Sequence, residues 1–314
     1  MSVSAFMELV EARTKLASIL PFLVGVLFAF AYFGRLDGVN TALFFVAMLL
    51  FDMTTTAINN LMDYQKAKDA TYQRETNVIG RRHLAVGQVT ALILGMLGAA
   101  TVLGLVLVWR TDWLLLLIGA ACFVIGIFYT FGPLPLSRLP LGEVFSGVTM
   151  GLGIPFIAVF INVAPNDLLG LTVTWPVVAL HGDFVSLIAL FLVCVTPMAT
   201  IANVMLANNL SDIAQDTANH RMTLPMYLGQ GGGVRLWQTL TYSGYVAVVG
   251  AVLLGALTWP VLVTLLALPL VARNANRFAH RQDKARTFPM ALRNLMLENG
   301  GLIIGLALSL LVKR

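Results

Sequence analysis

Two short polar segments carry the residues of this chain that could do chemistry. The first spans residues 59–63 (NNLMD), and the second spans residues 208–212 (NNLSD) and is followed by Asp216. Residues four apart share one face of an α-helix, which aligns Asn59 with Asp63, and Asn208 with Asp212 and Asp216. Amide and carboxylate oxygens are ligands that Mg²⁺ prefers, and water and phosphate oxygens complete its octahedron. We therefore predict that the two segments are the halves of one magnesium centre that holds a phosphate-bearing substrate.

The composition places both segments in a membrane protein. Of the 314 residues, 58% are hydrophobic and 11% are charged, whereas about 25% are charged in an average soluble domain. A spanning helix needs about 20 mostly apolar residues, and we predict nine: 16–34, 41–62, 88–109, 113–131, 143–163, 184–207, 236–257, 258–273 and 294–312. The prediction is an all-α bundle that forms one integral membrane domain (1–314). Asn and Asp are also common where helix ends simply meet water, but two matching ends in a membrane protein favour a functional site.

Lys and Arg are distributed unevenly between the two sides of this predicted bundle. With nine helices, 16 of the 20 lie on one side and 4 on the other, and the more basic side of a membrane protein faces the cytosol. We therefore expect the N-terminus and both polar segments on the cytosolic side of the cell membrane, and the C-terminus outside. The net charge of +5 reflects this bias, so we expect no nucleic-acid partner, and no required protein partner is evident.

Further charged residues lie close to the two segments. Asp52 precedes Asp63 by eleven residues, which places it within about 20° of the same helical face. It would line a cavity or hydrogen-bond a neighbouring helix, and we favour the second role. Lys66 stays on the face of Asp63 if the helix continues one more turn, where a base would neutralise diphosphate oxygens that a metal leaves uncovered. Lys15, before the first apolar run, is more simply interpreted as a lipid-headgroup anchor than as a contact to an anionic ligand.

Three loops carry weaker signals. The sequence Gly-Pro-Leu-Pro within residues 129–138 excludes helix and fixes where Tyr129 and Arg138 point. An apolar stretch in the outer loop, residues 168–180, is compatible with a short interfacial helix. Basic residues recur at helical spacing between residues 273 and 284, which indicates an amphipathic cytosolic segment on anionic lipid; they are Arg273, Arg277, Arg281 and Lys284.

Together these residues resemble the UbiA superfamily of intramembrane aromatic prenyltransferases, and within it the 1,4-dihydroxy-2-naphthoate polyprenyltransferases of the menaquinone pathway. The first motif of that branch, N-D-x-x-D-x-x-x-G-x-D, falls on Asn59, Asn60, Asp63, Ala67 and Asp69. The second, N-N-x-R-D-x-x-x-D followed by a basic residue and Thr-Leu, falls on Asn208, Asn209, Ser211, Asp212, Asp216, Arg221, Thr223 and Leu224. The Y-T-x-G-P-x-P-L and L-G-E elements fall on residues 129–136 and 141–143. Asn60 replaces an acid of the pattern, Ala67 a glycine and Ser211 an arginine, and the missing acid lowers the negative charge of the first half-site.

The resemblance implies a bundle with a central cavity that opens to the cytosol, and Mg²⁺-dependent transfer of a polyprenyl group. A polyprenyl diphosphate would alkylate 1,4-dihydroxy-2-naphthoate, giving demethylmenaquinone, diphosphate and CO₂. The implied metal ligands are Asn59, Asp63, Asp69, Asn208, Asp212 and Asp216. The implied diphosphate contacts are Lys66, Arg82, Arg138 and Arg221. The metal would assist departure of the diphosphate, with Asp63, Asp212 and Asp216 essential to catalysis and Tyr129 a candidate to stabilise the allylic cation.

Two other functions are compatible with the sequence. One keeps the reaction and changes the acceptor, for example to 4-hydroxybenzoate or another phenol. The other is an ion or metabolite carrier that uses Asp52 and the two acidic segments as its path. The acids cluster at one membrane face, and no pair of broken helices recurs in two halves of the chain. The sequence therefore favours the enzyme over the carrier.

Overall fold

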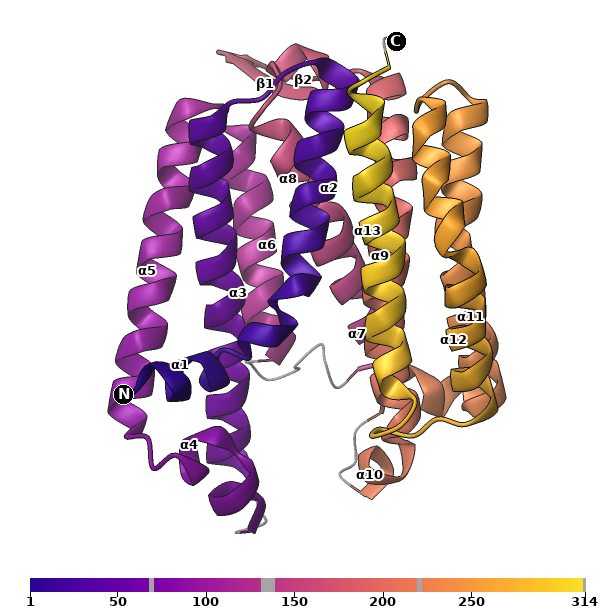
Figure 1. Cartoon of the computed structure of the whole chain (residues 1–314). Coiled ribbons are helices and arrows are strands. Elements are labelled where there is room, and N and C mark those ends of the chain that lie inside the picture. Colours follow the sequence, from indigo (N-terminus) through magenta and orange to yellow (C-terminus); the bar gives the residue numbers. More distant parts are fainter. Residues whose placement is uncertain (68–70, 131–138, 219–221, 313–314) are drawn as a thin grey trace.

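Long apolar stretches of this chain form long helices, because a backbone in lipid must satisfy its hydrogen bonds within its own segment. A computed structural model describes residues 1–67, 71–130, 139–218 and 222–312, and Figure 1 shows most of its helices running side by side. The α-helices are α1 (Val3–Leu9), α2 (Leu16–Phe33), α3 (Gly38–Lys66), α4 (Val78–Arg81), α5 (Val86–Arg110), α6 (Leu114–Thr130), α7 (Gly142–Ser146), α8 (Ile154–Phe160), α9 (Phe184–Ser211), α10 (Ile213–Ala218), α11 (Leu224–Leu253), α12 (Leu268–His280) and α13 (Phe288–Ser309). Short 3₁₀ or π segments are η1 (Ala12–Lys15), η2 (Tyr72–Thr76), η4 (Gly147–Gly153), η5 (Pro165–Asp167) and η6 (Trp259–Ala267).

Six helical segments of the described chain are long and apolar enough to cross a membrane. They are Ala12–Phe33, Gly38–Lys66, Val86–Arg110, Gly142–Phe160, Phe184–Ser211 and Leu224–Leu253. The protein is therefore a mostly helical, multi-pass membrane protein, as predicted. The other three predicted spans are also helical, but α6 has 17 residues, the eighth changes from η6 to α12 at Leu268, and α13 carries Glu298 within it. The count of nine spans and the orientation in the membrane stay predictions.

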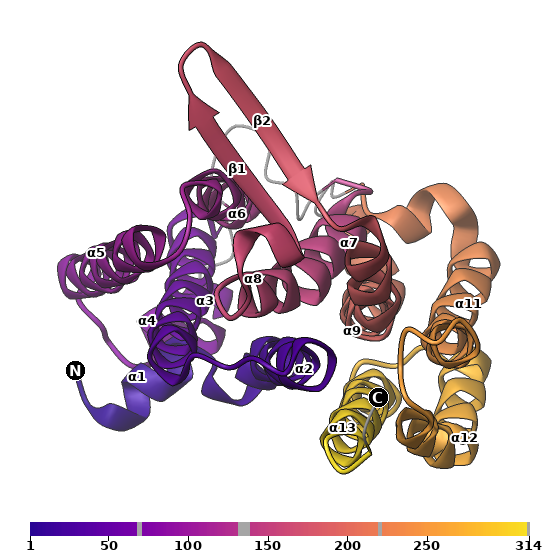
Figure 2. The same ribbon diagram turned by 90° about the horizontal axis from the view of Figure 1, so that it is seen from above.

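The expectation of a short helix at residues 168–180 is wrong, because this segment forms a β-hairpin. Strand β1 (Leu169–Thr174) pairs antiparallel with β2 (Val177–Gly182). β-Branched Val and Thr favour extended chain, and Trp175 and Pro176 connect the strands. The hairpin lies at the opposite end of the bundle from the ends of α3 and α9 and projects sideways (Figures 1 and 2). The all-α class therefore holds for the bundle and fails for this connection.

The helices pack closely around α9, which lies between α8 on one side and α11 and α13 on the other (Figure 2). Small residues allow such close approach in membrane bundles. A Cβ added to Gly151 in η4 would stand 2.4 Å from the backbone Cα and N atoms of Met198 in α9. Glycine is thus the only residue that fits this contact without moving one of the two backbones.

Separate apolar clusters support the ends of α3 and α9, which we call the motif end of the bundle. Under α3, the side chains of Leu9 and Leu61 are buried together with Ile79 of α4. Beside α9, the rings of Trp237 in α11 and Phe278 in α12 lie with centroids 4.6 Å apart and are fully buried. Apolar packing therefore holds both helix ends in place, in addition to their polar contacts.

Replacing Gly151 with alanine should destabilise the protein, because the new methyl group overlaps the α9 backbone. Overpacking costs about 1–3 kcal/mol, and we expect the apparent melting temperature in detergent to fall by several degrees. The matched control is Gly98→Ala in α5, where a Cβ meets nothing within 4 Å and alanine favours the helix. An unchanged melting temperature for Gly151→Ala would contradict this account of the α9 contact.

Candidate active site

The helix α3 carries the first polar segment on one unbroken face. Asp37 caps the start of the helix by accepting the backbone N–H of Asn40 at 2.8 Å, and the helix continues to Lys66. Asn59, Asp63 and Lys66 therefore share a face, as helical spacing predicts. All three line the same cavity.

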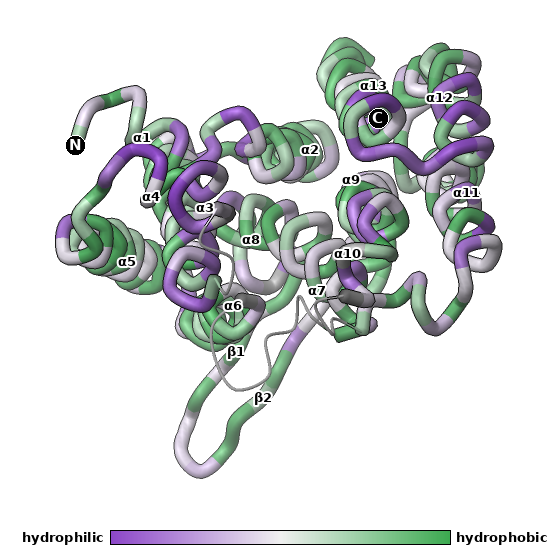
Figure 3. The backbone as a smooth tube through the Cα atoms, turned by 90° about the horizontal axis from the view of Figure 1, so that it is seen from below, coloured by the Kyte–Doolittle hydropathy of each residue, from purple (hydrophilic) through white to green (hydrophobic). Residues whose placement is uncertain are grey.

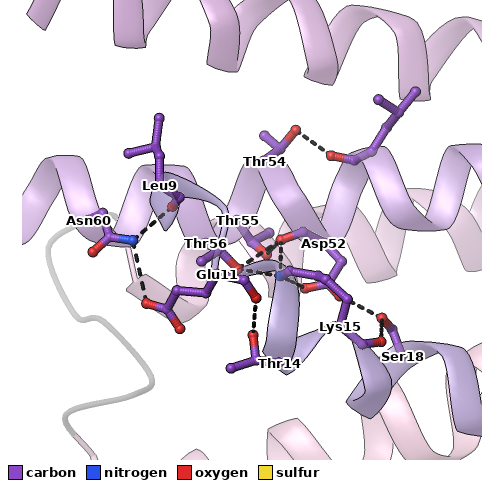
Figure 4. Close-up of polar contacts among 11 residues, drawn as sticks. Leu9, Glu11, Thr14, Lys15, Ser18, Asp52, Thr54, Thr55, Thr56 and Asn60 are labelled. Atoms are coloured by element: carbon purple, nitrogen blue, oxygen red, sulfur yellow. Dashed lines mark hydrogen bonds and ion pairs between the residues drawn. The ribbon is translucent and has the colours of Figure 1, made fainter. Parts of the chain in front are cut away.

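Deeper on this face, Asp52 lines the cavity and forms an ion pair with the buried Lys15. The Nζ atom of Lys15 lies 2.7 Å from Asp52 Oδ1 and 2.7 Å from Thr56 Oγ1, and the hydroxyl of Ser18 donates to Asp52 Oδ2 at 2.6 Å (Figure 4). The side chains of Lys15 and Asp52 are 8% and 17% exposed. Lys15 is therefore not a headgroup anchor, and Asp52 bonds the neighbouring helix as favoured from the sequence. Lys15 therefore compensates the charge of Asp52 in the cavity wall, from behind the lining.

Asn60 has a structural role that an acid could not fill. Its side-chain amide donates to the carbonyl of Leu9 at 2.9 Å and lies 3.5 Å from Glu11 Oε1 (Figure 4). An ionised aspartate has no proton to donate to Leu9. Glu11 lines the cavity in a left-handed backbone conformation with φ of 48°. A carboxylate that no sequence motif singled out therefore stands at the cavity beside the first segment.

The helix α9 carries the second polar segment to its C-terminal end. The helix ends one residue before Asp212, which is its C-cap, so the predicted column of Asn208, Asp212 and Asp216 is not one unbroken helix. Asn208 lines the cavity with the first segment. Asp216 in α10 is buried, and its Oδ2 accepts the hydroxyl of Thr223 at 3.4 Å. The structure thus brings Asn208 to the first segment and directs an oxygen of Asp216 toward the start of α11.

Glu143 of the Leu-Gly-Glu element positions the end of α9. The amide of Asn209 donates to Glu143 Oε1 at 2.8 Å, and both residues are buried. The hydroxyl of Tyr129 donates to the carbonyl of Gly142 at 3.4 Å, one residue before Glu143. The first contact ties the end of α9 to α7, next to Asn208, and the second ties α6 to the start of α7.

Lys284 reaches the second segment from the connection between α12 and α13. Its ammonium group contacts both Asn208 Oδ1 and Asp212 Oδ2 and lies 5.3 Å from the centre of the Phe288 ring. The sequence placed Lys284 on a lipid-facing segment, and that interpretation is wrong for this residue. The helical spacing between Arg273 and Lys284 could not predict this contact, because α12 ends at His280. The chain then turns toward the second segment.

Asp283 organises the connection that presents Lys284. The backbone N–H groups of Arg286 and Ala285 donate to Asp283 Oδ1 at 2.9 and 3.0 Å. These bonds favour the ionised carboxyl, so the N–H of Arg286 above all lowers the pKa of Asp283 below its usual value. The ionised Asp283 therefore stabilises the turn fully at pH values above the ordinary aspartate pKa of about 3.9. This stabilisation is lost as the pH falls through the lowered pKa of Asp283. The turn is therefore intact at neutral pH.

A cavity of about 960 Å³ joins the two segments. Its polar lining includes Glu11, Asn59, Asp63, Lys66 and Asn208. The remaining lining is mostly apolar and comes from α2, α3, α5, α6, α9 and the segment from α7 to α8. The stacked rings of Phe51 and Phe123, whose centroids are 4.1 Å apart, are part of it. The site therefore combines oxygen ligands and a base with a large apolar space.

The structure does not bring every predicted site residue to this cavity. Asp212 and Asp216 are not among its lining residues, and Asn208 alone represents the second segment there. Asp69, Arg138 and Arg221 lie outside the described residues. Tyr129 lines the cavity, whereas Arg82 forms an ion pair with Glu8, with Nε 2.9 Å from Oε2. Arg82 therefore faces the N-terminal helix rather than the cavity.

The donor set fits Mg²⁺ that is shared with a substrate. Within the part of the chain that the structure describes, no three His, Cys, Asp or Glu side chains converge into a preformed metal cage. However, the oxygens of Asn208 and Asp212 already converge on one cation, the Lys284 ammonium. Mg²⁺ commonly uses one or two carboxylates and completes its shell with water and phosphate oxygens. Asn59 with Asp63, and Asn208 with Asp212, are suitable partial ligand sets of this kind.

Comparison with known proteins gives consistent results. Residues 18–296 match the model of the UbiA prenyltransferase family. A 1,4-dihydroxy-2-naphthoate octaprenyltransferase of Bacillus subtilis is 28% identical over 283 residues, covering 88% of this chain and 82% of the relative. One from Mycobacterium leprae is 33% identical over 184 residues, covering 59% and 54%. Among solved structures, a UbiA homolog from Archaeoglobus fulgidus bound to DMAPP and Mg²⁺ has a TM-score of 0.63 at 12% identity, covering 98% of this chain and 99% of that one. An apo UbiA homolog from Aeropyrum pernix has a TM-score of 0.65 at 15% identity, covering 96% and 98%.

The ion pair of Lys15 and Asp52 gives a prediction about stability. Lys15→Met should destabilise the protein, because it leaves the Asp52 charge uncompensated. The cost should be smaller than the roughly 3–5 kcal/mol of a fully buried pair, since Asp52 lines the cavity and is partly exposed. The double variant Lys15→Met/Asp52→Asn should recover much of the loss, because it removes both charges. Melting temperatures of the two single variants and the double variant in detergent measure the coupling. Additive effects would show that the two charges do not interact.

Proposed function

This chain belongs to the UbiA prenyltransferase family, and from that premise we propose that it transfers a polyprenyl group from polyprenyl diphosphate to 1,4-dihydroxy-2-naphthoate with the aid of Mg²⁺. The chain is a prenyltransferase, and it is similar to relatives named for this acceptor. The products are diphosphate, CO₂ and a prenylated naphthohydroquinone that oxidises to demethylmenaquinone. The proposal places the reaction in menaquinone biosynthesis, at a site that opens to the cytosol.

One observation carries the proposal, namely that Asn59 and Asp63 of the first segment and Asn208 of the second line a single, largely apolar cavity. A polyprenyl diphosphate has a polyanionic head and a long hydrocarbon tail. The lining of the cavity matches both parts, because Asn59, Asp63, Lys66 and Asn208 stand beside apolar walls. An ion path would instead need polar groups that continue through the bundle, which the apolar and aromatic lining does not provide.

Side chains of the two segments would hold and orient the diphosphate. When bound, Mg²⁺ on the carboxylate and amide oxygens of Asn59, Asp63, Asn208 and Asp212 supplies Lewis-acid neutralisation of the leaving diphosphate. Lys66 would donate hydrogen bonds to oxygens that remain uncovered. As the allylic C–O bond breaks, its electron pair stays on the diphosphate, so these groups stabilise the charge that develops there.

The apolar interior would protect the allylic cation and orient the acceptor. Tyr129, Phe51 and Phe123 line the cavity, and aromatic faces attract a cation. The ring carbon that bears the carboxylate forms the new bond to the prenyl carbon. The carboxylate then leaves as CO₂, and the electron pair of the broken C–C bond restores the aromatic ring. No additional base is needed for this step, because no proton is lost from the ring carbon.

The activity is tested with purified protein, 1,4-dihydroxy-2-naphthoate and prenyl diphosphates of several lengths. We expect diphosphate release and a prenylated product by mass spectrometry only with Mg²⁺. Asp63→Ala and Asp212→Ala should each lower the rate at least about 100-fold, as is typical for loss of an electrostatic catalytic group. Asp167→Ala is the control, because Asp167 pairs with Arg35 at 2.7 Å next to the hairpin, far from the motif end.

The same assay decides between acceptors when 4-hydroxybenzoate and other phenols are offered in parallel. CO₂ release should accompany product formation only with the naphthoate. Faster alkylation of another phenol would overturn the proposed acceptor while leaving prenyl transfer intact. Full activity of Asp63→Ala or Asp212→Ala would overturn the metal assignment.

Lys284 should contribute to diphosphate binding, because its ammonium group already stands between Asn208 and Asp212. For Lys284→Met we expect the KM for prenyl diphosphate to rise about tenfold or more, since a hydrogen bond to a charged group contributes about 1.5–3 kcal/mol. Lys284→Arg should retain most of the affinity. Arg293→Met, which removes an exposed cation from α13, is the matched control. Equal KM values for Lys284→Met and the wild type would limit Lys284 to a structural contact.

A further inference from the structure

A second, cationic groove lies between α12 and the start of α13, apart from the cavity of the candidate active site. It has a volume of about 780 Å³ and is lined by Pro269, Ala272, Arg273, Asn276, Arg277, His280, Arg286, Thr287 and Met290. Three arginines and a histidine therefore face one groove, and no carboxylate is among the lining residues. The groove shares no lining residue with the cavity that contains Asn59 and Asn208.

The arginines of this groove are available to an external anion. The ion pairs found among the described residues do not include Arg273, Arg277 or Arg286. Arg281 pairs with Asp283 at 3.2 Å, and Arg286 acts on the same carboxylate electrostatically, which leaves Arg273 and Arg277 as the two arginines without a neighbouring acid in the groove lining. Arg273 and Arg277 lie four residues apart on α12 and are exposed, so they share a face. Their guanidinium groups have the donors that bind phosphate oxygens in pairs.

The same helical face is apolar on the other side of these arginines. Leu270 of α12 is 54% exposed, and with Arg273 and Arg277 it follows the spacing i, i+3 and i+7 that marks one face of an α-helix. Leu266, at the end of the preceding η6, is 77% exposed. Figure 2 shows α12 at the rim of the bundle. Figure 3, viewed toward the motif end, shows the hydrophilic residues of α12 and of the connection to α13 gathered there. The exposed residues along this face thus change from apolar to basic toward the motif end.

We propose that this groove binds the headgroup of an anionic phospholipid, with the acyl chains along Leu266 and Leu270. Basic pockets between spanning helices on the cytosolic side of membranes bind such headgroups. A free phosphate would contact the arginines alone, whereas a phospholipid contacts the basic and the apolar parts of this face together. The phospholipid is therefore the occupant that accounts for the whole face.

Native mass spectrometry of the full-length protein, with phosphatidylglycerol and phosphatidylcholine added in equal amounts, tests the proposal. We expect the wild type to retain phosphatidylglycerol preferentially, and Arg273→Gln/Arg277→Gln to retain it at least about tenfold less. Arg235→Gln/Arg293→Gln removes two other exposed arginines and should leave retention unchanged. Arg273→Lys/Arg277→Lys keeps the charge and should retain an intermediate amount. Equal retention by the wild type and Arg273→Gln/Arg277→Gln would overturn the proposal.

A thermal-shift arm separates a lipid site from a phosphate site. Phosphatidylglycerol should raise the melting temperature of the wild type by several degrees and leave that of Arg273→Gln/Arg277→Gln unchanged. Inorganic phosphate at millimolar concentration should have no such effect. An equal shift with inorganic phosphate, or an equal shift with phosphatidylcholine, would overturn the assignment to an anionic phospholipid. Diphosphate release by the double variant, measured in the same preparation, verifies that it is folded.

Discussion

The structure depends on the cost of placing ions in a medium that excludes them. Two cations of the described chain lie directly against carboxylates at the cavity or at the motif end. Lys15 neutralises Asp52 between α2 and α3, and Lys284 neutralises Asp212 at the end of α9. The proposed diphosphate site lies where α3 and α9 end, beside the apolar lining of the cavity. In the proposed complex, the diphosphate head would lie at the polar end of the cavity and the hydrocarbon tail along its apolar walls.

Several contacts act on the ligands indirectly. Glu143 holds Asn209 and thus orients its neighbour Asn208, while Asp283 shapes the turn that presents Lys284. Asn60 ties the N-terminal turn to α3 and brings Glu11 to the cavity. Without these supports, side chains at helix ends would be free to rotate, since the last turn of a helix lacks part of its own hydrogen bonding. The order of the site thus derives from connections between elements that are distant in sequence.

Much of this organisation could be predicted from the sequence, and the failures have physical reasons. Apolar length predicted the spanning segments, and helical spacing predicted that Asn59, Asp63 and Lys66 share a face, because both are local properties. The hairpin was missed because an apolar run of a dozen residues does not distinguish strand from helix by length alone. Lys284 and Glu11 were missed because each reaches the site through a turn, and a turn removes the helical periodicity on which the interpretation rested. Asn60 looked like a lost ligand, since only the fold shows that its amide has another partner.

The pairing of Lys15 with Asp52 also bears on how the protein enters the membrane. An aspartate near the centre of a spanning helix costs about 2.5–3.5 kcal/mol during insertion. Its partner belongs to the immediately preceding span, so the neutral pair requires only the first helical hairpin, α2 and α3. The ribosome finishes this hairpin long before α9 and α13 are made. The charge that the mature fold needs in its cavity wall is therefore already compensated at the translocon, and insertion of the second span does not wait for the rest of the bundle.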